Sequence, residues 1–306
     1  MKVITSTWFE YTQNKPAEPD WLVKGLITRG SRNVLFGDTS VGKSRLVVGL
    51  LLAILRGEAF LDEYQCAKGK VHYIVNDMPE QDWFGILRKA QNKYPDLCGE
   101  NATQSWCSGN FDIVKTMQDI RNDNPPEWAQ DAYNSASEVY VIDAFNNSFL
   151  EETEKPHLMK RIVFAWREFQ EWLPGNPTLL FIVQETKGHP DKIAKHAYSG
   201  AYPLAQDMTC MIRLWEKEDG AEIKHMTITK ARGLPKQATI DVSLDDDAVL
   251  FYNVTGDPSE RLIRTLLTSG EDKHEIKRIY LETTKQTEGA FSKKWQKTTG
   301  KLFSKS

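Results

Sequence analysis

An eight-residue stretch near the start of the chain has the residue types and the spacing needed to bind a chain of phosphates. It follows the pattern G-x-x-x-x-G-K-S, in which glycines let backbone N–H groups turn toward phosphate oxygens. The lysine would reach the β- and γ-phosphates of ATP, and the serine hydroxyl would hold Mg²⁺. The stretch reads Gly37-Asp38-Thr39-Ser40-Val41-Gly42-Lys43-Ser44.

The residues on either side of this loop predict the two elements that must position it. Residues 33–36 (NVLF) form a short β-branched and aromatic run, which is typical of a strand. Residues 45–56 (RLVVGLLLAILR) form a segment that is long enough and apolar enough for a buried helix. That helix would add the positive end of its dipole to the loop. This context favours a nucleotide-binding loop over a chance match.

A carboxylate follows the apolar run at residues 139–142 (VYVI). Asp143 is placed to hold Mg²⁺ through water, next to Ser44. We expect the two residues to meet because adjacent parallel strands end at one crevice. Many apolar strands end in Asp, so this prediction depends on the phosphate-binding loop.

Two more carboxylates follow the strand predicted at residues 70–75. Asp77 is a candidate base that orients the attacking water, and Glu80, one helical turn further on, is the alternative. A helix is predicted from Pro79 to about residue 93. The alternative is that Asp77 only caps this helix, and the sequence does not decide between the catalytic and the capping role.

Polar residues also end two later strands. Gln184 follows residues 178–183 (TLLFIV) and is a candidate sensor of the γ-phosphate, since an amide both donates to phosphate and orients water. The alternative is a solvated strand end. Lys230 and Arg232 lie two residues apart and project from the same side of a strand. They form either a solvated edge or a pair of fingers that reach the nucleotide of a neighbouring subunit.

A basic loop at residues 187–196 (KGHPDKIAKH) carries three lysines and one acid. Lysines that follow phosphates and aromatic rings that stack on bases suit single-stranded nucleic acid. A solvated loop explains the composition equally well. The candidate DNA contacts are Lys187, Lys192, Lys195 and Tyr198.

The composition of the 306 residues narrows the class of protein. A net charge of −3 is no overall signature of nucleic-acid binding, so such contacts must come from local patches. The four cysteines form no C-x-x-C pair, which argues against a zinc site and a disulfide framework. The longest apolar run, residues 46–55, is about half a membrane span. We expect a cytoplasmic protein without membrane contact.

Strands that alternate with helices predict an α/β fold with a mostly parallel sheet covered on both faces. Antiparallel edge strands are expected at residues 207–215 and 223–230. This domain would span residues 1–256, with 1–30 as an N-terminal lead-in. Residues 257–306 predict a small, mostly helical module with a basic tail. It is either a winged-helix-like module that binds DNA or protein, or a packing appendage.

The order of these motifs resembles that of the RecA-like hexameric helicase ATPases, which are P-loop NTPases, and within them the RepA-like group of plasmids and phages. The resemblance covers about residues 19–235. It is carried by residues 19–27 (PDWLVKGLI), similar to W-L-V-x-G-L-I, by 71–80 (VHYIVNDMPE), by 181–188 (FIVQETKG), by 199–201 (SGA), and by 230–235 (KARGLP), similar to a K-x-R-x-G tip that supplies trans-acting fingers.

The resemblance implies a Mg²⁺-dependent ATPase that forms a ring, most simply a hexamer, and moves along single-stranded DNA as a replicative helicase. Two departures concern hydrolysis. Asn76-Asp77 stands where the family has its catalytic glutamate, and Gln184-Glu185 replaces paired histidines. Two alternatives therefore stay open: a DNA-binding or annealing protein without unwinding activity, and a nucleotide-gated regulatory or assembly ATPase.

Overall fold

The computed structural model describes most of the chain. The described residues are 18–95, 99–107, 112–147, 156–185, 201–218, 220–231, 239–245, 250–254, 259–260, 262–263, 266 and 272–303. The four candidate DNA contacts and Arg232 lie outside them. The chain divides into two compact units, the first comprising Met1–Thr239 and Ser243–Tyr252 and the second Ile240–Val242 and Asn253–Ser306.

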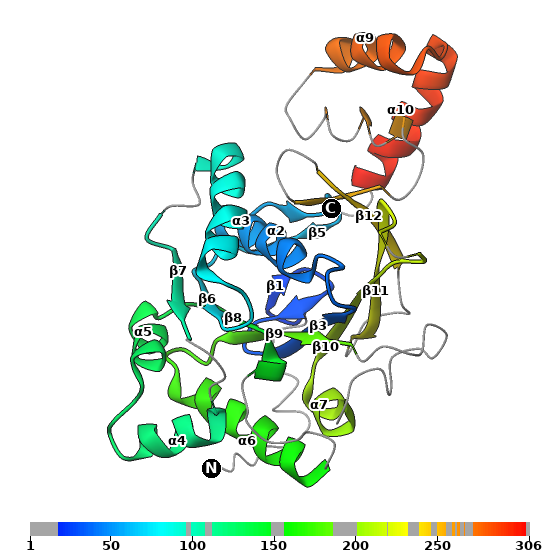
Figure 1. Cartoon of the computed structure of the whole chain (residues 1–306). Helices are drawn as coiled ribbons and strands as arrows, with labels where there is room; N and C mark the ends of the chain where they lie inside the picture. The colour runs from blue at the N-terminus through cyan, green and yellow to red at the C-terminus, as the bar shows by residue number, and fades with distance from the viewer. Residues whose placement is uncertain are drawn as a thin grey trace, which may run out of the picture. The chain divides into compact units, whose positions relative to one another are not determined.

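The main sheet has nine strands within the described ranges, in the order β13-β12-β11-β10-β3-β9-β8-β6-β7 (Figure 1). Its strands are β3 (Arg32–Gly37), β6 (Val71–Val75), β7 (Ala102–Trp106), β8 (Val139–Asp143), β9 (Thr178–Gln184), β10 (Cys210–Trp215), β11 (Ile223–Ala231), β12 (Thr239–Leu244) and β13 (Phe251–Asn253). Two short hairpins accompany it: β1 (Trp21–Val23) with β2 (Ile27–Thr28), and β4 (Ala59–Phe60) with β5 (Tyr64–Gln65).

The strands from β10 to β7 run parallel to one another, and β11 is antiparallel to β10. Every residue of β6 and β8 is buried, because a parallel sheet covered on both faces needs apolar side chains on both. The predicted α/β fold with a mostly parallel sheet is confirmed.

Three details differ from the sequence-based prediction. Strand β10 is parallel to β3 and lies inside the sheet, so β11 is the strand at which the direction changes. Strand β8, which ends in Asp143, is not adjacent to β3, because β9 lies between them. Strand β7 was not predicted, since its sequence (ATQSW) is polar and partly exposed.

Helices cover both sides of the sheet. Figure 1 shows α2 and α3 on one side and α4, α6 and α7 on the other. Among the described residues of this unit the helices are α2 (Lys43–Arg56), α3 (Glu80–Lys93), α4 (Ile113–Arg121), α5 (Glu127–Ser135), α6 (Pro156–Trp172) and α7 (Ala201–Asp207), with a 3₁₀ turn, η2, at Phe145–Asn147. The core under α6 is aromatic: Trp166 and Phe181 pack with ring centroids 5.2 Å apart.

The second unit contains two longer helices, α9 (Lys273–Thr284) and α10 (Glu288–Phe303), in agreement with the predicted helical module. Asp272 caps α9 by accepting hydrogen bonds from the backbone N–H groups of His274 and Glu275. Tyr280 and Phe291 pack in its small core. In the described part of the chain, none of the helices is both long and apolar enough to cross a membrane.

Candidate nucleotide-binding site

The predicted phosphate-binding loop connects β3 to α2 and lies at the carboxyl end of the parallel strands. Its two glycines are required by the backbone. A Cβ on Gly37 would clash with the carbonyl oxygen of Leu214 in β10. Gly42 has a φ of 99°, and a Cβ there would lie 2.8 Å from the ring of Phe251. Glycine alone tolerates both environments, so the loop can bring its N–H groups close to a phosphate.

Lys43 lies buried at the start of α2 and folds back over the loop. Its Nζ donates to the carbonyl oxygens of Gly37 (3.1 Å) and Asp38 (2.7 Å). Burial lowers the pKa of Lys43, and nearby carboxylates oppose that shift. Those carboxylates are Asp143, Asp77, Asp38 and Glu185. The ammonium group can bind a phosphate, and the carboxylates around it favour a cation beside that phosphate.

Ser44 and Asp143 meet as the sequence predicted, although their strands are not neighbours. The hydroxyl of Ser44 donates to Oδ2 of Asp143 at 2.6 Å. Asp143 is 2% exposed, and burial raises its pKa, while hydrogen bonds from Ser44 and Tyr73 act in the opposite direction. The start of α2 therefore extends past the end of β9 to reach β8.

These two residues suit Mg²⁺ rather than a metal held only by protein. Within the described residues there is no group of three or more His, Cys, Asp or Glu side chains that could hold a metal ion. Mg²⁺ prefers oxygen ligands and usually binds one or two protein groups together with substrate phosphates. A serine hydroxyl beside a carboxylate, next to a phosphate-binding loop, fits that chemistry.

The candidate base and the candidate sensor are in contact. Nε2 of Gln184 donates to Oδ2 of Asp77 at 3.0 Å, and the backbone N–H of Gln184 donates to Oδ1 of Asn146 at 3.1 Å. Both Asp77 and Glu80 are exposed, Glu80 in the first turn of α3. The strand order β9-β8-β6 brings Gln184 and Asp77 to one edge of the site.

A buried ion pair behind the loop was not predicted. Arg213 in β10 binds Glu185 through two hydrogen bonds, of 3.0 Å and 2.7 Å, across the end of β3. Their side chains are 12% and 4% exposed. The available signal was an arginine inside the otherwise apolar strand β10, since a buried charge requires a partner. Tyr73, which also binds Asp143, was missed because a tyrosine in an apolar strand is ordinary core.

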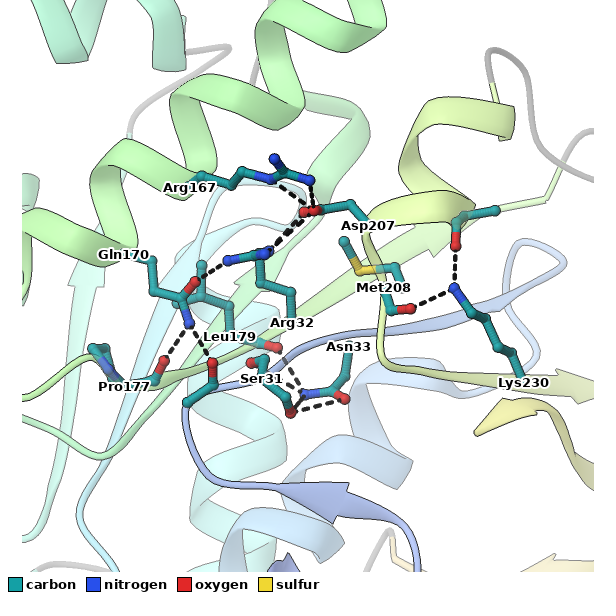
Figure 2. Close-up of polar contacts among 12 residues, drawn as sticks. Ser31, Arg32, Asn33, Arg167, Gln170, Pro177, Leu179, Asp207, Met208 and Lys230 are labelled. Carbon is teal, nitrogen blue, oxygen red and sulfur yellow. Dashed lines mark hydrogen bonds and ion pairs between the residues drawn. The ribbon is translucent and has the colours of Figure 1, made fainter. Parts of the chain in front are cut away.

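Lys230 lies near the end of β11, next to helix α7. Its Nζ donates to the backbone carbonyls of Ala205 and Met208, both at 2.5 Å, as Figure 2 shows. Lys230 pairs with Met211, in the first half of β10, so it lies away from the carboxyl end where its own phosphate-binding loop lies. Arg232 lies outside the described residues, so the predicted pair of fingers remains a prediction.

Comparisons with known proteins address the family and the fold of the chain. A model of the AAA domain family matches residues 2–188, which is more than half of the chain. A solved ATPase domain has a similar fold, with a TM-score of 0.50 and 11% identity over 74% of this chain and 86% of that one. A KaiC-like protein from Pyrococcus horikoshii matches with a TM-score of 0.49 and 13% identity over 76% of this chain and 93% of that one.

No curated protein sequence matches the chain significantly. The family match covers the phosphate-binding loop, Asp77, Asp143 and Gln184, which are the residues that the strand order brings to one end of the sheet. The predicted assignment to RecA-like P-loop ATPases is confirmed at the level of fold and family. The chain therefore belongs to the AAA domain family and has a RecA-like P-loop ATPase core.

Proposed function

We propose that this protein hydrolyses ATP with Mg²⁺ and couples hydrolysis to movement along single-stranded DNA, as a ring-forming helicase of plasmid or phage replication. The observation that carries the ATPase part is the contact of Ser44 with Asp143 beside the buried Lys43. In this arrangement the loop and Lys43 would hold the phosphates. When bound, Mg²⁺ would neutralise charge on the phosphate oxygens.

The base and the sensor have separate roles in this proposal. Asp77 accepts a proton from, and orients, the attacking water, while Gln184 donates to the γ-phosphate. Their mutual hydrogen bond holds both side chains at the edge of the site before nucleotide binds. Glu80, in the first turn of α3, is the alternative base.

The proposed ring assembly is supported by the position of Lys230. This residue lies on a part of the sheet remote from the subunit's own loop. That placement supports a contribution of Lys230 and Arg232 to a neighbour's nucleotide, where cations stabilise charge in the transition state. Lys230 would have to leave the carbonyls at the end of α7 to do so.

The DNA partner is supported by the basic composition of residues 187–196 and by the family resemblance. An annealing or DNA-binding protein without unwinding activity is a second candidate. It is favoured by Asp77, whose carboxylate is shorter than that of a glutamate and is bound to Gln184. A regulatory or assembly ATPase is the third.

One set of assays separates the three functions. ATP hydrolysis is measured with and without single-stranded DNA, and unwinding is measured on a forked duplex. A helicase shows stimulated hydrolysis and unwinding, and an annealing protein binds DNA without unwinding. If DNA neither binds nor stimulates hydrolysis, both DNA-linked functions are excluded.

Two sets of variants test the residue roles. Asp77→Asn should slow hydrolysis by about 10²-fold or more, and Glu80→Gln should change it little. Normal turnover of Asp77→Asn would move the base elsewhere. Arg232→Ala should slow hydrolysis only in the assembled protein. Intact hydrolysis in assembled Arg232→Ala would exclude the trans-acting role.

A further inference from the structure

The phenol of Tyr73 contacts the carboxylate of the metal site. Its hydroxyl donates to Oδ2 of Asp143 at 2.7 Å, and the same oxygen accepts the hydroxyl of Ser44 at 2.6 Å. Tyr73 is 3% exposed and lies in β6, which is separated from β3 by β9 and β8. Two hydroxyls from different elements thus converge on one carboxylate oxygen.

The register of the sheet explains how Tyr73 reaches this position. Tyr73 pairs with Val141 and Val75 pairs with Asp143, so Tyr73 and Asp143 lie on the same face, two residues apart along the strands. That offset is roughly 6.6 Å, which the long side chain of a tyrosine spans and a shorter side chain does not.

The ring of Tyr73 is itself held in place. It packs on Trp83 of α3, with ring centroids 4.2 Å apart. Nε1 of Trp83 donates to Oε1 of Gln104 in β7 at 2.7 Å. A connected set of contacts therefore links strand β7, helix α3 and the carboxylate of Asp143. The hydroxyl of Tyr73 has little freedom to move away from Asp143.

We infer that Tyr73 is a positioning residue for the metal site. This inference rests on the proposed Mg²⁺-dependent ATPase function. Tyr73 holds the carboxylate of Asp143 in one orientation, in which Ser44 donates its proton to Oδ2. The oxygen of Ser44 then keeps its lone pairs for a metal, because its proton is already committed to Asp143. Without Tyr73 the carboxylate gains a rotamer, and the site is less ready for Mg²⁺.

The test uses Tyr73→Phe in the full-length chain. The affinity for a fluorescent ATP analogue is measured with Mg²⁺ and with EDTA. The readout is the dissociation constant in EDTA divided by the dissociation constant in Mg²⁺, which we call the Mg²⁺ ratio. We expect the affinity in EDTA to stay within about twofold and the ratio to fall about three- to tenfold, the factor that one hydrogen bond contributes.

Tyr140→Phe is the matched control. Tyr140 in β8 is fully buried, and its hydroxyl donates to the carbonyl oxygen of Ala132 at 2.8 Å. Its hydroxyl also accepts a hydrogen bond from the backbone N–H of Ser137 at 3.0 Å. This variant therefore loses a buried hydroxyl and its hydrogen bonds, but outside the metal site. It should lower the thermal unfolding temperature at least as much as Tyr73→Phe does and leave the Mg²⁺ ratio unchanged.

The outcomes separate this inference from the proposed function. An unchanged ratio in Tyr73→Phe overturns the inference and leaves the ATPase proposal standing. A wild-type ratio of one removes the ATPase proposal and the inference with it. If Tyr73→Phe does not fold, Trp83→Phe is measured, which loses the bond to Gln104. Its ratio should fall in the same direction, and an unchanged ratio again overturns the inference.

Discussion

The two ends of the parallel strands carry polar clusters of opposite character. At the amino end, Asp207 accepts hydrogen bonds from Arg32, at 2.6 Å, and from Arg167, while Gln170 binds Arg32 and the carbonyl oxygens of Gly30 and Pro177 (Figure 2). The carboxylate there is matched by two guanidinium groups, and the amide has partners on both its oxygen and its nitrogen.

At the carboxyl end the described charged residues are arranged differently. Four carboxylates act on the buried ammonium group of Lys43, and Glu185 among them is paired with Arg213. Burial raises the pKa of Asp143 and lowers that of Lys43, so folding alone disfavours both charges. A metal and a phosphate chain would compensate this cost. The amino end is complete without a ligand, and the carboxyl end is arranged to receive one.

The comparison predicts that the largest effect on function comes from Lys43→Ala. ATP hydrolysis should fall by about 10²- to 10³-fold, because one charge that stabilises the transition state is removed. The unfolding free energy should change by less than about 1 kcal/mol, since burial disfavours the ammonium group. Hydrolysis and thermal denaturation are measured together, with the exposed Lys24→Ala as the control. A stable variant with normal hydrolysis contradicts the comparison.

The two ends should also respond to pH with opposite sign. His72, near the amino end of β6, lies between the hydroxyls of Thr103 and Ser105, and burial lowers its pKa from 6.5 to about 4. As the pH falls, the imidazole of His72 therefore takes up a proton at a higher pH in the unfolded chain than in the folded protein. The contribution of neutral His72 to the unfolding free energy is complete above pH 6.5. This contribution falls by about 3 kcal/mol as the pH is lowered to about 4.

Denaturation of His72→Gln across that pH range tests this sign. The variant should lose less stability than the wild type on acidification. Asp143→Asn should lose more stability than the wild type on acidification. The raised pKa of the Asp143 carboxyl means that the wild type gains stability from this group as the pH falls, and the variant does not. If both variants lost more stability than the wild type on acidification, or both lost less, the proposed contrast between the two ends would be wrong.

A smaller effect is expected from Asp207→Asn. Its loss leaves Arg32 and Arg167 without their common carboxylate, but their side chains are 25% and 47% exposed and can be hydrated in part. We expect a loss of about 2–3 kcal/mol of unfolding free energy, less than for a fully buried pair. Nucleotide affinity should stay within about twofold. The surface pair of Arg121 with Glu168 provides the control, and Glu168→Gln should cost less than about 1 kcal/mol.

The smallest effect on stability is expected from Lys230→Met, which keeps the apolar stem and loses the bonds to the carbonyls at the end of α7. We expect a loss of about 1 kcal/mol of unfolding free energy in the isolated subunit. The exposed Lys217→Met is the control and should have no measurable effect. The proposed role of Lys230 in a neighbour's site predicts in addition a deficit in hydrolysis that appears only in the assembled protein.

The sequence predicted those parts of the site that are local along the chain. The glycine loop between a strand and a helix is recognisable from neighbouring residues, because the backbone requires glycine at Gly37 and Gly42. Asp143 was recognisable because it directly follows an apolar run. The helical C-terminal module was recognisable from the apolar stripe of α9.

The contacts between distant segments could not be predicted in this way. The contact of Gln184 with Asp77, and that of Arg213 with Glu185, depend on which strands are neighbours in the sheet. The periodicity of a strand says that it is buried but not which strand lies beside it. Strand β10 was therefore expected at an antiparallel edge, and the structure has it parallel to β3.

The sequence by itself determined that residues 37–44 have the pattern of a phosphate-binding loop and that the surrounding fold is α/β, because both follow from residue types at fixed local spacings. Only the tertiary structure decided that the start of α2 reaches past β9 to Asp143 and that Tyr73 holds the same carboxylate. The physical reason is that strand order and register set distances across a sheet. Those distances decide which polar side chains share a hydrogen bond.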